Sequence, residues 1–178
     1  MCWLDVIWAP WRSKYIREVS SAKKQNREQR CIFCEAVKKD DNEALILYRG
    51  KSCYVMMNLY PYNTGHIMII PYNHVPSIEY LSSSELLEMM QLVKISIKII
   101  KQALNPDGFN IGINLGRAAG AGIEEHVHMH VVPRWVGDAN FMPIIAGVKV
   151  LPQDVQETYK ILKPYYEEIH ANTIFENS

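Results

Sequence analysis

Apolar residues gather in short runs over the first half of the chain and recur at helical spacing after it. Three runs of apolar residues bounded by turn formers predict β-strands at residues 44–48, 52–57 and 66–71. Residues 58–65, which contain Pro, Asn and Gly, predict a loop between the second and third runs. Because the connections are short, we expect neighbouring strands to pair in antiparallel fashion.

A long amphipathic helix is predicted after the third strand. Ser82 and Glu85 have the spacing of a capping box, and apolar residues recur every three or four positions from Leu86 to Leu104. The following Asn-Pro-Asp-Gly sequence ends this helix.

Two further strands and a C-terminal helix complete the pattern. The strands are expected at residues 109–115 and 126–132, and the helix at residues 153–170, with a kink or break at Pro164. The predicted fold class is α+β, a five-stranded antiparallel sheet with one main long helix and a C-terminal helix.

Length and composition indicate one domain with an extension. The chain has 178 residues, of which 48% are hydrophobic. A polar stretch at residues 20–30 predicts an N-terminal arm, residues 1–30, ahead of a domain at residues 31–178. The 19 basic residues balance the 19 acidic ones, which argues against a nucleic-acid partner. No apolar run approaches the ~20 residues that span a bilayer, and the first residues do not resemble a secretory signal. We therefore expect a cytoplasmic protein with no membrane partner.

Three of the six histidines, His126, His128 and His130, occupy alternate positions. Because side chains on a strand alternate between faces, these imidazoles share one face, spaced about 7 Å apart. The apolar residues between them face the other way. Two functions fit this arrangement. It is either a metal site built from imidazoles, or a nucleophilic histidine whose neighbours hold and tune the substrate.

A glycine-rich loop, residues 116–122, leads directly into the histidine segment. It precedes a strand rather than a helix, so it is not a dinucleotide-binding fingerprint. Small residues allow backbone N–H groups to approach an anion closely. The loop next to three histidines therefore indicates a phosphate-bearing substrate.

The spacing His-x-His-x-His resembles the signature of the histidine triad superfamily of nucleotide hydrolases and transferases. Residues 58–71 resemble the nucleotide-binding strand-loop-strand of that superfamily, and residues 110–116 the strand before its phosphate loop. Residues 7–16 and 132–149 are similar to the bacterial branch of diadenosine tetraphosphate phosphorylases or hydrolases. The resemblance implies that residues 31–178 form a histidine triad domain and that the protein is a homodimer.

The resemblance also implies a reaction. His128 would attack the α-phosphorus of a dinucleoside polyphosphate, with diadenosine tetraphosphate the expected substrate, and form a nucleotidyl-histidine intermediate. His126 and His130 would be its catalytic neighbours. Asn58 would bind ribose hydroxyls. The full set of implied nucleotide contacts is Asn58, Asn114, Gly120, Gly122 and His130.

One departure from the superfamily leaves the second half of the reaction open. Many members carry Gln and Ser or Thr four and three residues before the first histidine, where this chain has Gly122 and Ile123. Backbone N–H groups, Arg117 or Glu124 would then supply those contacts, and the acceptor is either phosphate or water. The alternatives are a nucleotide- or zinc-binding regulatory module with little turnover and a nucleoside phosphoramidase of the same superfamily.

Cys31 and Cys34 form a Cys-x-x-Cys pair, a spacing typical of a metal site or a redox site. A redox motif is expected in a βαβ unit, which the sequence after Cys34 does not indicate. The resemblance implies a structural zinc bound by this pair together with His74 and His126, a donor set that suits tetrahedral zinc. The sequence indicates no role for His66.

Overall fold

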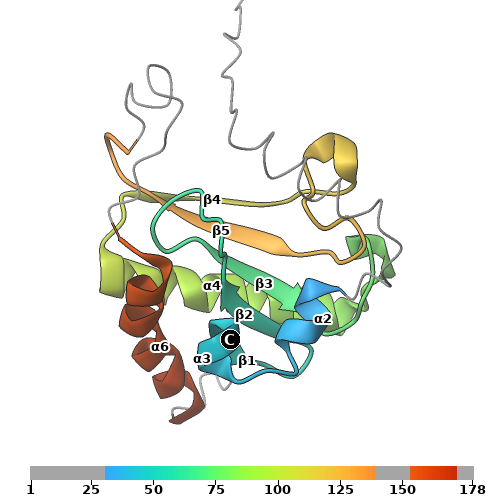
Figure 1. The fold of residues 1–178 in the computed structure, drawn as a ribbon, viewed down its shortest axis with the longest axis horizontal. Coiled ribbons are helices and arrows are strands. Elements are labelled where there is room, and N and C mark those ends of the chain that lie inside the picture. Colours follow the sequence, from blue (N-terminus) through green and yellow to red (C-terminus); the bar gives the residue numbers. More distant parts are fainter. Residues whose placement is uncertain (1–30, 139–152, 172–178) are drawn as a thin grey trace, which may run out of the picture.

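The computed structural model describes residues 31–138 and 153–171. In these residues five strands form one antiparallel sheet in the order β1-β2-β3-β5-β4 (Figure 1). This confirms the predicted five-stranded α+β fold. The strands are β1 Ile46–Arg49, β2 Cys53–Met57, β3 Ile67–Pro71, β4 Gly108–Ile113 and β5 Met129–Arg134.

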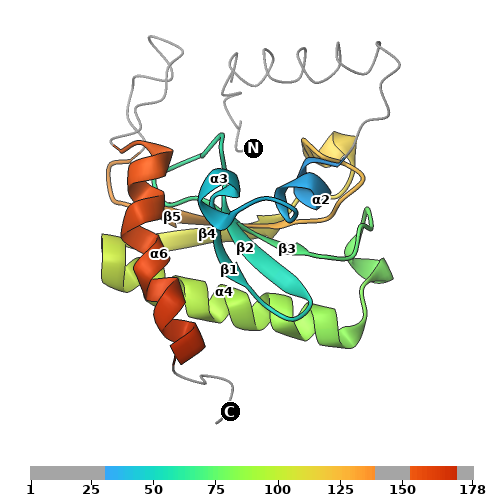
Figure 2. The same cartoon turned by 60° about the horizontal axis from the view of Figure 1, so that its bottom comes forward.

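Helices cover both faces of the sheet. Figure 2 shows the long helix α4 on one side, and α2 and α3 on the other. The C-terminal helix α6 packs against α4 and β1. The helices are α2 Ile32–Ala36, α3 Asp41–Ala44, α4 Ser83–Leu104 and α6 Val155–Ala171, with 3₁₀ turns η1 Ile78–Tyr80 and η2 Arg117–Ala119.

Alternation along the strands divides the apolar core into two clusters. One face of the sheet packs on α4 and α6, where Val55, Ile69 and Val131 are fully buried. The other face carries a smaller cluster that includes Phe33, from α2, and Met68. Because Met68 on β3 pairs with His130 on β5, His130 lies on the face that carries this smaller cluster.

The long helix α4 begins and ends as the sequence predicted. The Ser82 hydroxyl accepts a hydrogen bond from the Glu85 N–H at 3.3 Å, and the Glu85 carboxylate accepts one from the Ser82 N–H at 2.7 Å. The reciprocal pair is the predicted capping box. Asn105 ends the helix in the left-handed conformation.

The sequence predicted a kink or a break at Pro164, and the structure excludes the break, because α6 continues through that residue. Proline removes one backbone hydrogen bond, but tertiary contacts hold both halves of the helix. Tyr159 and Leu162 are buried on one side of Pro164, and Tyr166 is buried on the other. The Tyr166 hydroxyl also donates to the Ser96 hydroxyl of α4 at 2.7 Å.

The strand predicted at residues 126–132 begins later, at Met129. The Val127 N–H donates to the carbonyl of Val75 at 2.7 Å rather than to a neighbouring strand. His126 and His128 therefore precede the regular ladder. The predicted alternation still holds, since Val127 lies in the α4-facing cluster with Met129.

Some sequence predictions fall outside the described residues. The N-terminal arm, residues 1–30, is among them, and so is most of the segment 132–149. The division of the chain at residue 31 therefore stays a prediction. Among the described residues, no helix has both the length and the apolar character that a membrane crossing requires.

Candidate functional site

The structure brings the four predicted metal ligands together from three separate segments. Cys31 precedes α2 and Cys34 lies within it, while His74 follows β3 and His126 precedes β5. One ligand atom from each residue lies within 4.8 Å of the other three. Segments far apart in the sequence thus converge on one point.

The distances between these atoms fit a shared tetrahedral ion. Nδ1 of His126 lies 3.2 Å from Nδ1 of His74 and 3.2 Å from Sγ of Cys31. Sγ of Cys34 lies 3.5 Å from Nδ1 of His74 and 3.6 Å from Nδ1 of His126. Zinc bond lengths of about 2.3 Å to sulfur and 2.0 Å to nitrogen, at tetrahedral angles, imply N–N and N–S distances of about 3.3 and 3.5 Å. The donor set therefore fits zinc in both chemistry and spacing.

A hydrogen bond fixes the orientation of the His126 ring. Its Nε2 lies 2.9 Å from the carbonyl oxygen of Pro71, which can only accept, so Nε2 carries the hydrogen and Nδ1 the lone pair. Burial lowers the pKa of His126, which favours the neutral ring that binds a metal. Burial, followed by the hydrogen bond and the charge of the neighbouring Cys31, raises the pKa of Cys34.

A hydrogen bond also fixes the orientation of the His128 ring. Its Nδ1 lies 2.8 Å from the carbonyl oxygen of His126, so Nδ1 donates and Nε2 carries the lone pair. Among the residues that the structure describes, Nε2 of His128 has no hydrogen-bond partner. Only 5% of His128 is exposed, and this burial lowers its pKa, so the ring is neutral at pH 7. A neutral, oriented imidazole is what nucleophilic attack on phosphorus requires.

His66, for which the sequence indicated no role, joins the site through His130. The Tyr62 N–H donates to Nδ1 of His66 at 3.0 Å, so the His66 hydrogen is on Nε2. Nε2 of His66 lies 3.0 Å from Nδ1 of His130, which must accept. Neutral His130 therefore carries its hydrogen on Nε2. The sequence did contain a signal for this contact. His66 lies two residues before Met68, so both side chains lie on the same face of the sheet, and Met68 pairs with His130.

Asn58 lies beside His66 at the end of β2. Its backbone N–H donates to the carbonyl of His66 at 3.0 Å, and its Nδ2 lies 3.5 Å from the His66 ring. Its Oδ1 accepts from the Tyr60 N–H at 2.9 Å, so the backbone holds the amide oxygen and not the amide NH₂ group.

Asn114 and the glycine-rich loop follow β4. In the β4–β5 register Ile113 pairs with Met129, so Asn114 lies alongside His128, one residue beyond the ladder. Gly120 takes a left-handed conformation, and its N–H donates to the carbonyl of Arg117 at 3.0 Å. A phosphate contact at Gly120 therefore requires that bond to open, whereas Gly122 is exposed.

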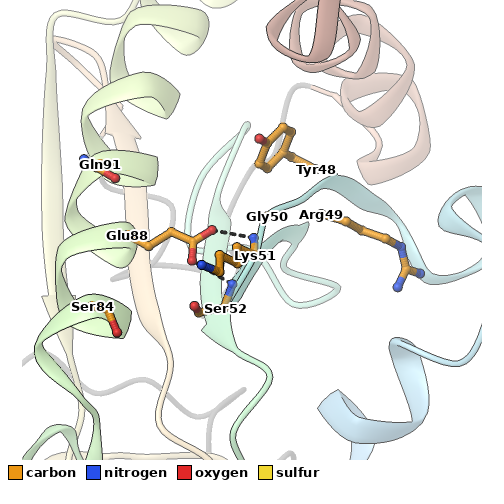
Figure 3. Close-up of a pocket in the computed structure, with 8 residues that line it drawn as sticks. All are labelled: Tyr48, Arg49, Gly50, Lys51, Ser52, Ser84, Glu88 and Gln91. Atoms are coloured by element: carbon orange, nitrogen blue, oxygen red, sulfur yellow. Dashed lines mark hydrogen bonds between the residues drawn. The ribbon is translucent and has the colours of Figure 1, made fainter. Parts of the chain in front are cut away.

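A cavity of about 420 Å³ lies apart from the histidines, between the β1–β2 turn and α4 (Figure 3). Its central group is the carboxylate of Glu88, which accepts from the N–H groups of Lys51 and Ser52 at 2.6 Å each. These bonds satisfy the carboxylate and brace the turn. Among the described residues, no histidine or cysteine lines this cavity, so it is separate from the histidine site.

Comparisons with known proteins agree on one family. The model of the HIT domain matches residues 39–136. The AP-4-A phosphorylase of Mycobacterium tuberculosis is 43% identical over 161 residues, which are 89% of this chain and 83% of that protein. Among solved structures, a zinc-bound histidine triad family protein from Mycobacterium smegmatis superposes with a TM-score of 0.62 at 23% identity, covering 79% of this chain and 96% of that one. A hypothetical histidine triad nucleotide-binding protein from Sulfolobus tokodaii gives 0.61 at 27% identity, covering 78% and 93%.

Proposed function

The chain belongs to the HIT domain family, and from this membership we propose that it cleaves dinucleoside polyphosphates, with diadenosine tetraphosphate as the substrate and His128 as the nucleophile. The observation that carries this proposal is the orientation of His128. Its Nδ1 bonds to a carbonyl oxygen at 2.8 Å, and this bond directs the lone pair to Nε2 in a neutral, buried ring. The 43% identity to an AP-4-A phosphorylase supports the substrate class.

In the first step, Nε2 of His128 attacks the α-phosphorus of diadenosine tetraphosphate. A bond forms between Nε2 and phosphorus, the bond from phosphorus to the bridging oxygen breaks, and ATP leaves. The ring, now joined to AMP and still carrying its Nδ1 hydrogen, is positively charged. The His126 carbonyl dipole stabilises that charge as it develops, because its bond to Nδ1–H strengthens.

The neighbouring groups bind the phosphates and the ribose. His130 donates its Nε2–H to a non-bridging phosphate oxygen, and His66 fixes that tautomer. Asn114, alongside His128, donates to the same phosphate, and the exposed backbone at Gly122 contributes an N–H group. Asn58 contacts the ribose hydroxyls through its amide NH₂ group.

In the second step, inorganic phosphate attacks the AMP group, releases His128 and yields ADP. Phosphate rather than water is proposed as the acceptor because the relative at 43% identity is a phosphorylase. The test is incubation with diadenosine tetraphosphate with and without inorganic phosphate. ADP plus ATP, formed only with phosphate, is the expected result. AMP plus ATP without phosphate would make the protein a hydrolase, and the absence of products in both would favour a binding module.

We also propose that zinc occupies the four-residue ligand set of Cys31, Cys34, His74 and His126. The supporting observations are the convergence of the four ligand atoms within 4.8 Å of one another and the hydrogen bond that orients His126. When bound, zinc supplies cross-linking rather than catalysis, because all four positions around it are taken by protein atoms. It ties α2 and the segment after β3 to the start of the catalytic segment.

A homodimer is the proposed assembly. β4 lies at the edge of the described sheet, and its Ile111 is 43% exposed. An exposed edge strand with an apolar residue is a surface suited to pairing with a second copy. Light scattering should give twice the mass of one chain, and the Ile111→Glu variant should have the mass of a single chain. A cytoplasmic location, like the lack of nucleic-acid and membrane partners, stays a prediction.

A further inference from the structure

Phe33 lies between the two cysteines of the Cys-x-x-Cys pair, yet its ring contacts the catalytic segment. Only 2% of the residue is exposed. Its ring centroid lies 4.9 Å from that of His128, with the planes inclined at 57°. The same ring lies edge-on to His126, at 5.4 Å and 83°. One aromatic side chain thus touches both a metal ligand and the nucleophile.

A hydrogen bond from the sheet also fixes the backbone of Phe33. The Tyr54 hydroxyl, from β2, donates to the carbonyl oxygen of Phe33 at 3.0 Å. Tyr54 is fully buried, and burial raises its pKa well above the usual range, so it remains a donor at every physiological pH. Tyr54 in turn stacks on Tyr72 at 5.3 Å. The position of Phe33 is therefore set by the sheet as well as by the adjacent cysteines.

The His128 ring needs such a support. A single hydrogen bond, from Nδ1 to the His126 carbonyl, fixes one atom of the ring but leaves its tilt free. The tilt is restricted by packing: Phe33 contacts the ring at 4.9 Å and His130 contacts it at 4.8 Å, nearly perpendicular. The direction of the Nε2 lone pair depends on this tilt.

We propose that Phe33 is a positioning residue that holds the His128 imidazole at the angle required for attack on phosphorus. The inference rests on the proposed function, since it takes His128 as the nucleophile. The proposal also gives the Cys-x-x-Cys segment a function beyond metal binding. The residue between the two cysteines restricts the orientation of the ring that bears the reacting atom. An error of about 1 Å in such a position costs roughly a hundredfold in rate.

The experiment compares Phe33→Ala and Phe33→Leu with a control, Ile46→Ala. Ile46 is fully buried in the same apolar cluster but lies on β1, two strands away from β3. For Phe33→Ala we expect kcat to fall roughly 10- to 100-fold with KM within about threefold, because only the reacting geometry is disturbed. Phe33→Leu retains apolar volume and should recover part of the rate. Ile46→Ala should lose stability without this loss of kcat in the folded protein.

Two further readouts separate positioning from a general structural role. Zinc content should be the same in Phe33→Ala as in the unaltered protein. In Phe33→Ala the ring C–H resonances of His128 should shift and broaden as the ring tilt becomes free, with or without substrate, while the Nδ1–H tautomer that the His126 carbonyl fixes is retained.

Three outcomes would overturn the inference: unchanged kcat in Phe33→Ala, an equal loss in Ile46→Ala, or loss of zinc that accounts for the loss of rate. Experiments on the unaltered protein distinguish failure of the proposed function from failure of this inference. If that protein forms no adduct on His128, the reaction scheme fails, while the resonances of the His128 ring still test whether Phe33 restricts its tilt.

Discussion

Removal of the proposed zinc should lower the melting temperature of the protein first and reduce its activity as a consequence. The four ligand atoms lie within 4.8 Å of one another but come from segments as far apart as Cys31 and His126. If zinc is present at a thousand times its dissociation constant, it contributes about 4 kcal/mol to folding. At roughly 2–4 °C per kcal/mol for a domain of this size, its loss should lower Tm by roughly 8–16 °C.

The assay is thermal unfolding, with elemental analysis, of three samples: the protein as purified, the protein after strong chelation, and a Cys31→Ser/Cys34→Ser double variant. Chelation and the double variant should give the same lowered Tm, and activity should fall as a consequence. His128→Ala is the matched control, because it lies two residues from a ligand but should keep one zinc per chain. Fully active protein with no zinc would refute the reasoning, and so would an unchanged Tm after zinc is lost.

Substitutions at three other residues test separate contacts. Asn58→Ala should weaken nucleotide binding by about 1–3 kcal/mol. A nucleotide that lacks both ribose hydroxyls should bind the variant and the unaltered protein with the same affinity. An equal loss of affinity for both nucleotides would exclude the ribose contact. His66→Ala should lower kcat at least about tenfold, and His66→Gln, which keeps a donor toward His130, should restore part of it; an unchanged kcat would remove His66 from the site. Tyr166→Phe should cost about 1–3 kcal/mol in urea unfolding, because it leaves the buried Ser96 hydroxyl without its 2.7 Å donor, and a smaller change would show that water replaces that donor.

Local sequence signals predicted the parts of the fold that depend on neighbouring residues. The capping box at Ser82 and the apolar period of α4 act within one helix, and both were confirmed. The alternation around His128 follows from strand geometry, and it places Val127 and Met129 in the core. The metal ligands were reached only through resemblance, because nothing local links His74 to the cysteines.

The features that the sequence did not reveal depend on contacts between distant segments. The contact between His66 and His130 requires β3 to lie beside β5, two strands separated by α4 and β4 in the sequence. The late start of β5 is decided by the hydrogen bond from Val127 to Val75. α2 and α3 have five and four residues, which are too few to show a helical period.

The central claim is that cleavage proceeds through a nucleotide bound covalently to His128. The most direct measurement is rapid quenching of the protein mixed with diadenosine tetraphosphate in the absence of phosphate, followed by peptide mapping by mass spectrometry. The account predicts an AMP group on His128, its release as ADP when phosphate is added, and no adduct in His128→Ala, which should still bind the nucleotide within roughly tenfold. Turnover without any adduct, or an adduct on another residue, would contradict it.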